Sequence, residues 1–166
     1  SLIEGEVDQP LIIAQVLKAF SAQHSALKGV IMGKQAIDDD CGQVGPMLAG
    51  LLGWPQATCA AAVRWLNDCV VEVDQEDDYG QKQITLSAPW VITTDLRLAT
   101  PRFPNVMALV QAQKASIHRC ALSDFECPQV HPVRALQYES VERKRAGQVV
   151  SSADELMACL KASGVL

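Results

Sequence analysis

The residues best suited to chemistry lie in GKQAIDDDCGQVG, residues 33–45, where three consecutive aspartates stand between glycines. Carboxylates can bind metal ions, and glycines let a backbone approach a phosphate closely. Calcium loops place their oxygen ligands at alternate positions, whereas Asp38, Asp39 and Asp40 are consecutive. The phosphate-binding pattern G-x-x-x-x-G-K-[ST] is absent as well. A nucleotide-binding loop and a solvated acidic turn remain as interpretations.

A second group of metal-type ligands comprises His118, Cys120, Cys127 and His131. Its spacing does not fit the C-x2-4-C and H-x3-5-H pairs of zinc modules, so we expect no metal there. The six cysteines include no CxxC pair. Because the chain is long and apolar enough to fold without disulfides, we expect free thiols and a reducing compartment.

Length and charge limit the class of protein. A chain of 166 residues predicts one domain. The formal charge of -5 argues against nucleic-acid binding, which requires a basic face. The opening SLIEGEVDQP lacks the basic start and long apolar centre of a signal peptide. No apolar run is long enough to span a bilayer, so we expect no membrane insertion.

The acidic loop is expected between a strand and a helix. Residues 10–23 have helical apolar spacing, and residues 27–34 form a short apolar run typical of a buried strand. A second short helix is expected over residues 45–53, ended by Gly53. A helix followed by a buried strand predicts an α/β fold with a parallel sheet. In such sheets, loops at the carboxyl ends of strands bind ligands, and helix amides attract anions.

The remaining elements are expected from apolar alternation and capping signals. The chain predicts an acidic turn over residues 74–81, an irregular stretch over 95–104, and no clear element over 117–132. Tryptophans 54, 65 and 90 are expected in the core or at an interface. One helix is expected over 105–115, capped by Asn105, and another over 151–164, where Ser152 and Glu155 form a capping box. Strands are expected over 57–66, 69–73, 82–88, 89–94 and 133–142.

Several segments together resemble the electron-transfer flavoprotein beta-subunit family. Residues 33–45 are similar to that family's signature, whose usual form is close to GKQAIDDDxNQTG. LLGWPQAT, TTDLRL followed by TPRFP, and the closing SSADELMACLKASG resemble further family segments in register. The resemblance therefore covers essentially the whole chain.

The resemblance implies a partial adenine-nucleotide-hydrolase-like (Rossmann-like) fold: a mostly parallel sheet with flanking helices and an extended C-terminal arm. Family members begin with further strands and helices, so we expect residues 1–166 to form one truncated α/β domain. Within it, the resemblance implies a nucleotide loop over residues 30–45, a partner recognition loop over 95–116, and the arm over 133–166.

The resemblance also implies a function. The beta subunit pairs with an alpha subunit to carry electrons on FAD from acyl-CoA dehydrogenases to the electron-transfer flavoprotein quinone oxidoreductase. It is an electron carrier rather than an enzyme, and it holds a structural AMP. It lies in the mitochondrial matrix of eukaryotes or the cytoplasm of bacteria. The alternatives are a second FAD in the AMP site, an adenine-nucleotide-dependent hydrolase or ligase of similar fold, and a scaffold without ligand.

The family's nucleotide site maps onto the signature loop and the strand before it. Gly42 replaces the usual asparagine and Val44 the usual threonine, so two hydrogen-bonding side chains are missing beside the phosphate. We therefore expect the phosphate to be held mainly by backbone amides. The implied nucleotide-binding residues are Val30, Ile31, Met32, Gly33, Lys34, Gln35, Ala36, Ile37, Asp38, Asp39, Asp40, Cys41, Gln43 and Gly45.

The family's recognition loop inserts one leucine into a hydrophobic pocket of the partner dehydrogenase. Aligned without a gap, this leucine falls on Val106, with Met107 and Leu109 as neighbouring candidates. A valine buries less apolar area than a leucine, so we expect weaker binding. The family's lysine cluster is reduced here to Lys114, which predicts weaker electrostatic steering.

Overall fold

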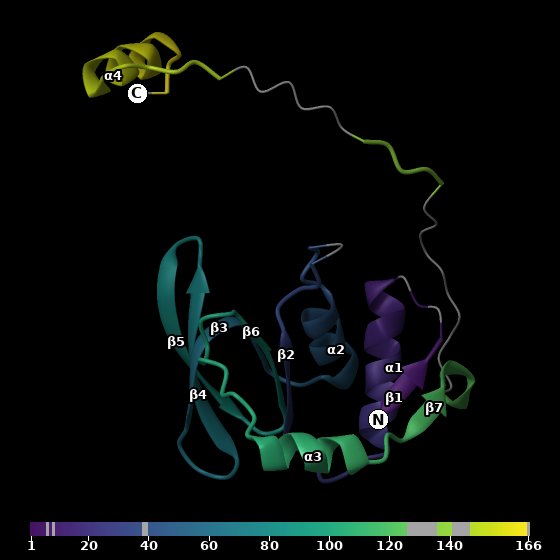
Figure 1. Ribbon diagram of the computed structural model, residues 1–166. Helices are drawn as coiled ribbons and strands as arrows, with labels where there is room; N and C mark the ends of the chain where they lie inside the picture. Colours follow the sequence, from purple (N-terminus) through teal and green to yellow (C-terminus); the bar gives the residue numbers. More distant parts are fainter. Residues whose placement is uncertain (6, 8, 38–39, 126–135, 141–146, 166) are drawn as a thin grey trace. The chain divides into compact units, whose positions relative to one another are not determined.

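The computed structural model describes the chain except for residues 6, 8, 38–39, 126–135, 141–146 and 166. Contacts divide the chain into two units, residues 1–133 and 134–166, which are described separately. The second unit begins close to the start of the expected C-terminal arm. The first unit contains β1 (Leu2–Glu4), α1 (Pro10–Ala22), β2 (Gly29–Gly33), α2 (Val44–Leu52), β3 (Gln56–Trp65), β4 (Val70–Asp77), β5 (Gly80–Ser87), β6 (Trp90–Thr94), α3 (Val106–Lys114), β7 (Arg119–Ala121) and the 3-10 turn η1 (Leu122–Asp124) (Figure 1).

The main sheet has the strand order β2-β6-β3-β4-β5. Strand β6 pairs in parallel with both β2 and β3, whereas β4 is antiparallel to β3 and β5. All strands of this sheet except β4 therefore run in the same direction. The predicted α/β class with a mostly parallel sheet is confirmed.

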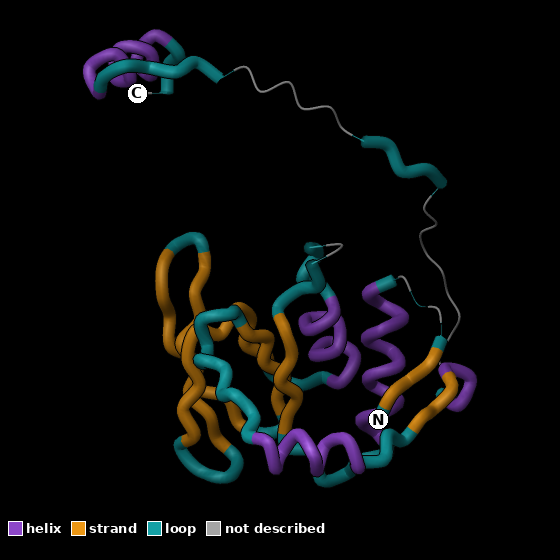
Figure 2. Tube along the Cα trace, in the orientation of Figure 1, coloured by secondary structure: helices purple, strands orange, loops and turns teal. Residues whose placement is uncertain are grey.

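Each face of the sheet has its own apolar core. Helices α1 and α2 cover one face, where Ala14, Leu48 and Val91 are buried and Val30 and Met32 pack against them (Figure 2). On the other face, a second cluster joins side chains of the four strands from β3 to β6, among them Val71, Val73, Trp90 and Ile92. Alternate residues of β6 thus serve opposite faces, which explains its continuous apolar sequence.

The helix signals read from the sequence are confirmed. Gly53 ends α2 in the left-handed conformation, with φ 68°. The Asn105 side chain caps α3 by accepting a hydrogen bond from the amide of Ala108 at 2.8 Å. In the second unit, α4 (Ala153–Ala162) is capped by Ser152, whose hydroxyl accepts from Glu155 N at 3.2 Å. The return bond differs from a capping box, because Glu155 accepts from Ser151 N at 2.8 Å.

The prediction of an acidic turn over residues 74–81 is wrong in its length, because the turn in the structure is shorter. Strand β4 continues to Asp77, and β5 already begins at Gly80. The acidic side chains are tolerated in β4 because cations on the two neighbouring strands face them. Arg64 on β3 pairs with Asp74 at 2.5 Å, and Lys82 on β5 pairs with Asp77 at 2.7 Å.

Two short strands were not expected from the sequence. Strands β1 and β7 pair in parallel, with Ile3 opposite Cys120. Each has three residues, too few for a periodic signal, and their pairing joins segments far apart in the chain. The strand expected over 133–142 is wrong for residues 136–140, which are exposed and have no strand structure; the rest of that range is not described.

The structure can be compared with the expectations of free thiols and of tryptophans in the core or at an interface. Among the described cysteines, Cys59, Cys69, Cys120 and Cys159 form no disulfide. Trp90 is buried and Trp54 packs against the helical core, but Trp65 is 60% exposed. Across the described residues, no helix has the length and apolarity needed to cross a membrane.

Gly29 gives a direct test of this packing. It lies opposite Trp90 in the β2–β6 pair, and a Cβ there would stand 2.4 Å from the indole ring. We predict that Gly29→Ala lowers the free energy of unfolding by about 1–3 kcal/mol, because the buried ring must move. Urea denaturation measures this change.

Gly50→Ala is the matched control, because a Cβ at this helical position has no heavy atom within 4 Å. It should raise the free energy of unfolding by up to about 1 kcal/mol, since alanine favours the helix. Equal destabilisation by both substitutions would contradict the packing described.

Candidate functional site

The candidate site lies where β2 and β6 end. These strands are parallel neighbours, so the loops that follow them begin at the same edge of the sheet. Gly33 lies opposite Thr94, and the amide of Lys34 donates to the carbonyl of Thr94 at 3.0 Å. The acidic loop therefore starts beside the segment that begins at Asp95.

A cavity of about 330 Å³ lies between these two loops. The signature loop contributes most of its lining, and the end of β6 and the following turn contribute the rest. Two aliphatic side chains in the lining, Ile37 and Leu96, are almost fully exposed. The lining residues are Gly33, Lys34, Gln35, Ala36, Ile37, Asp40, Thr94, Asp95 and Leu96.

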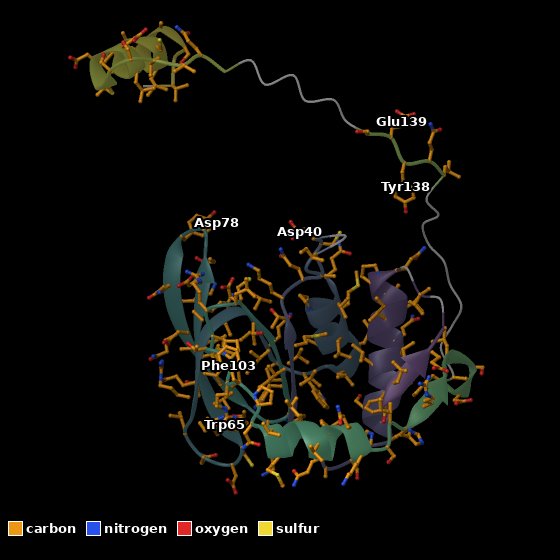
Figure 3. The ribbon with its side chains drawn as sticks, viewed as in Figure 1. Asp40, Trp65, Asp78, Phe103, Tyr138 and Glu139 are labelled. Atoms are coloured by element: carbon orange, nitrogen blue, oxygen red, sulfur yellow. The ribbon has the colours of Figure 1, made fainter. Side chains whose placement is uncertain are left out.

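Internal hydrogen bonds shape the acidic loop. The side-chain amide of Gln35 donates to the Asp40 carboxylate, and the Asp40 amide donates to the carbonyl of Ala36 at 3.2 Å. Asp40 lies on the loop between β2 and α2 (Figure 3). Asp40 and Gly42 both have left-handed φ values, 54° and 63°. Asp40 thus fixes the loop conformation. Asp38 and Asp39 lie outside the described residues.

Asp95 is the most constrained charge at the site. Its Oδ2 accepts from Lys34 Nζ at 2.8 Å, and its Oδ1 accepts from Arg97 N at 3.2 Å and from Arg97 Nε at 3.0 Å. Hydrogen bonds from Lys34 and then Arg97 hold the pKa of the Asp95 carboxyl well below its usual range. The same contact raises the pKa of the Lys34 ammonium. Both groups are charged at neutral pH.

The start of α2 lies against β6 because residue 45 is glycine. A Cβ on Gly45 would be 2.2 Å from the Cγ2 of Thr93, which is itself buried. This close approach sets the position of the first amides of α2, whose partial positive charge favours an anion. Pro46 supplies no amide, so the nearby donors come from the residues just before it.

The structure gathers some of the expected nucleotide-binding residues and separates others. Residues 33–37 and Asp40 line the cavity. Val30 and Met32 instead pack toward the helices, and Ile31 is half exposed. Cys41, Gln43 and Gly45 lie outside the cavity lining: Cys41 and Gln43 precede α2, and Gly45 lies in its first turn. Reasoning from sequence did not place Thr94, Asp95 and Leu96 in the site, although the TTDLRL motif that contains them was part of the resemblance.

The expected recognition residues lie on an exposed helix. None of the residues of α3 is buried, and Val106, Met107 and Leu109 are 74%, 68% and 49% exposed. In the same 95–116 segment, Leu96 and Phe103 are also almost fully exposed. The segment therefore presents several largely exposed apolar side chains, while Leu98 packs against the core of the sheet.

The structure describes two of the four histidine and cysteine residues that the sequence groups over 118–131. Cys120 Sγ lies 3.2 Å from His118 Nδ1, but Cys127 and His131 lie outside the described residues.

Comparison with known proteins identifies the family. The electron transfer flavoprotein domain matches residues 4–124. The chain is 44% identical over 155 residues to the probable electron transfer flavoprotein subunit beta of Saccharomyces cerevisiae, covering 92% of this chain and 59% of that protein. It is 41% identical over 152 residues to the mitochondrial subunit beta of Oryza sativa subsp. indica, covering 92% and 59%.

The human electron transfer flavoprotein subunit beta is 37% identical over 161 residues, with 97% of this chain and 62% of that protein covered. The chain spans about three fifths of the length of these relatives. The domain match and these identities agree with the loop and sheet described above. The chain belongs to the electron transfer flavoprotein family and is a homologue of its beta subunits.

Proposed function

We propose that this chain acts in the beta subunit of a heterodimeric electron-transfer flavoprotein. Paired with an alpha subunit that carries most of the FAD contacts, it would pass electrons from acyl-CoA dehydrogenases to the electron-transfer flavoprotein quinone oxidoreductase. The rice and Arabidopsis relatives are named mitochondrial. We therefore place the protein in the mitochondrial matrix if the source is eukaryotic, and in the cytoplasm if it is bacterial.

The observation that carries this proposal is the cavity between the signature loop and the end of β6. Its volume of about 330 Å³ is near the lower end for small-ligand sites, which suits a mononucleotide better than a dinucleotide. Ile37 and Leu96 offer apolar surface that a purine ring would cover. These features favour AMP over a second FAD.

The charges fit a phosphate held by amides rather than by lysine alone. Asp95 neutralises Lys34, so the lysine adds little net charge to the cavity. The first amides of α2 and the left-handed Gly42 provide the anion-binding backbone. AMP bound here would hold the two loops together as a structural ligand.

The geometry favours a carrier over a hydrolase or ligase. Such an enzyme needs an acid–base pair that faces its ligand. The two carboxylates that line the described part of the cavity are engaged elsewhere, Asp40 with Gln35, and Asp95 with Lys34 and Arg97. Both therefore serve the shape of the loops.

The nucleotide content tests the proposal. The chain, extended to the length of its relatives and purified with its alpha subunit, should release one AMP and one FAD per heterodimer on acid denaturation. Mass spectrometry of the released fraction gives the stoichiometry. Two flavins without AMP, or a complex with no adenine mononucleotide, would contradict it.

Gly42→Asn tests the phosphate end of the site. Asparagine tolerates the φ of 63° found here and adds a side-chain amide. We predict that AMP binds roughly fivefold more tightly by isothermal titration calorimetry, equivalent to about 1 kcal/mol for one hydrogen bond. Gly42→Ala is the control, because it adds a Cβ at the same φ but no side-chain amide, and alanine tolerates this φ less well than asparagine, so it should not tighten binding. A gain with alanine equal to that with asparagine would exclude this role.

Val106→Ala tests the recognition segment. Removing two methyl groups from a side chain that the partner buries should slow electron transfer from an acyl-CoA dehydrogenase roughly five- to tenfold, without a change in flavin content. Stopped-flow flavin reduction measures this rate. Leu66→Ala, at another exposed aliphatic residue outside the segment, should leave it unchanged. If Val106→Ala has no effect while Met107→Ala or Leu109→Ala slows transfer, the anchor is one of these neighbours instead.

A further inference from the structure

A chain of ion pairs crosses the edge of the sheet at the candidate site. Lys34 follows β2, Asp95 follows β6, and Glu76 lies near the end of β4. Lys34 pairs with Asp95 at 2.8 Å, Asp95 pairs with Arg97 at 3.0 Å, and Arg97 also pairs with Glu76. The four charges sum to zero, so their arrangement holds segments together rather than attracting a ligand.

Asp95 is the central group of this chain. Its side chain is only 14% exposed, compared with 36% for Lys34 and 66% for Arg97. Its backbone is fixed too, because its amide donates to Ala60 O at 3.2 Å and its carbonyl accepts from Leu98 N at 3.2 Å. Asp95 therefore contacts three segments: its carboxylate bonds Lys34 of the nucleotide loop, its amide bonds strand β3, and its carbonyl bonds Leu98 in the first turn of the 95–116 segment.

Asp95 belongs both to the proposed nucleotide site and to the proposed partner recognition segment. Asp95 and Leu96 line the cavity, and they also open the segment whose apolar side chains are exposed. A ligand in the cavity contacts the loops on both sides of the Lys34–Asp95 pair. The Lys34–Asp95 pair joins the two loops directly and so offers a route by which order in one loop can act on the other.

We propose that Asp95 is a positioning residue that couples nucleotide occupancy of the 33–40 loop to the order of the 96–104 segment. This proposal rests on the nucleotide site proposed above. Because binding free energies are reciprocal, a partner that orders the segment would in turn strengthen retention of the nucleotide. AMP, bound as a structural ligand, would then affect partner recognition as well as the stability of the fold.

Hydrogen–deuterium exchange of the alpha–beta complex tests the coupling without relying on nucleotide binding. In complex stripped of nucleotide, Lys34→Met should raise exchange in residues 96–104 roughly three- to tenfold, because the segment loses its tie to the nucleotide loop. Lys82→Met is the matched control, since Lys82 forms an ion pair of similar length, 2.7 Å, with Asp77 on the hairpin. It should leave exchange in 96–104 unchanged.

A second exchange experiment compares the complex with and without AMP. In the wild-type complex, AMP should slow exchange in both 34–42 and 96–104. In Asp95→Asn it should bind roughly tenfold more weakly and, at saturating AMP, slow exchange in 34–42 but not in 97–104, beyond the cavity-lining Leu96. Asp95→Glu, which keeps the charge, should restore part of the response in 96–104.

The outcomes distinguish the proposed coupling through Asp95 from the proposed AMP site. Unchanged exchange in 96–104 for Lys34→Met overturns the coupling, whether or not AMP binds. Raised exchange there, in a complex that binds no AMP, keeps the tie between the loops but overturns AMP as the ligand. An AMP response in 96–104 that is equal in Asp95→Asn and wild type also overturns the role of Asp95.

Discussion

The parallel pairing of β2 with β6 is the constraint on which the rest of the site depends. Each strand has five residues, and their register runs from Gly29 opposite Trp90 to Gly33 opposite Thr94. A slip of one residue would turn Val30 and Met32 away from the helices and move Lys34 away from Asp95. Gly29 fixes the register at one end because only a residue without a Cβ fits beside the Trp90 ring. The contact that closes the site thus depends on packing at the opposite end of the strands.

The site itself combines a rigid backbone with balanced charge. Gly45 lets α2 approach Thr93, and the left-handed Asp40 and Gly42 turn the loop back toward the helix. Of the three aspartates that first suggested a metal, Asp40 accepts a hydrogen bond from Gln35 within its own loop. Asp95, on the segment after β6, accepts from Lys34 and Arg97. Such an arrangement suits a ligand that is retained rather than transformed. It also places the loop proposed to bind the nucleotide next to the start of the segment proposed to meet the electron donor.

Much of the fold could be predicted from the sequence because its signals are local. Apolar periodicity located α1, β2, β6 and α3, and Gly53 and Asn105 marked helix ends. The β4–β5 hairpin was underestimated because its charges are paired across strands, as Lys82 is with Asp77, which composition does not reveal. The β1–β7 pair escaped notice because three residues carry no period. A third of the cavity lining was missed for another reason: Lys34 and Asp95 are 61 positions apart, and only the strand order brings them together.

Photoaffinity labelling with 8-azido-AMP tests the central claim most directly. Illumination of the alpha–beta complex, followed by peptide mapping, should place the label within residues 33–40 and 94–96 of this chain. Excess AMP should abolish that labelling, while excess ribose 5-phosphate, which lacks the purine, should compete poorly. Label found only elsewhere, or label within these residues that excess AMP does not reduce, would contradict a nucleotide site between the ends of β2 and β6.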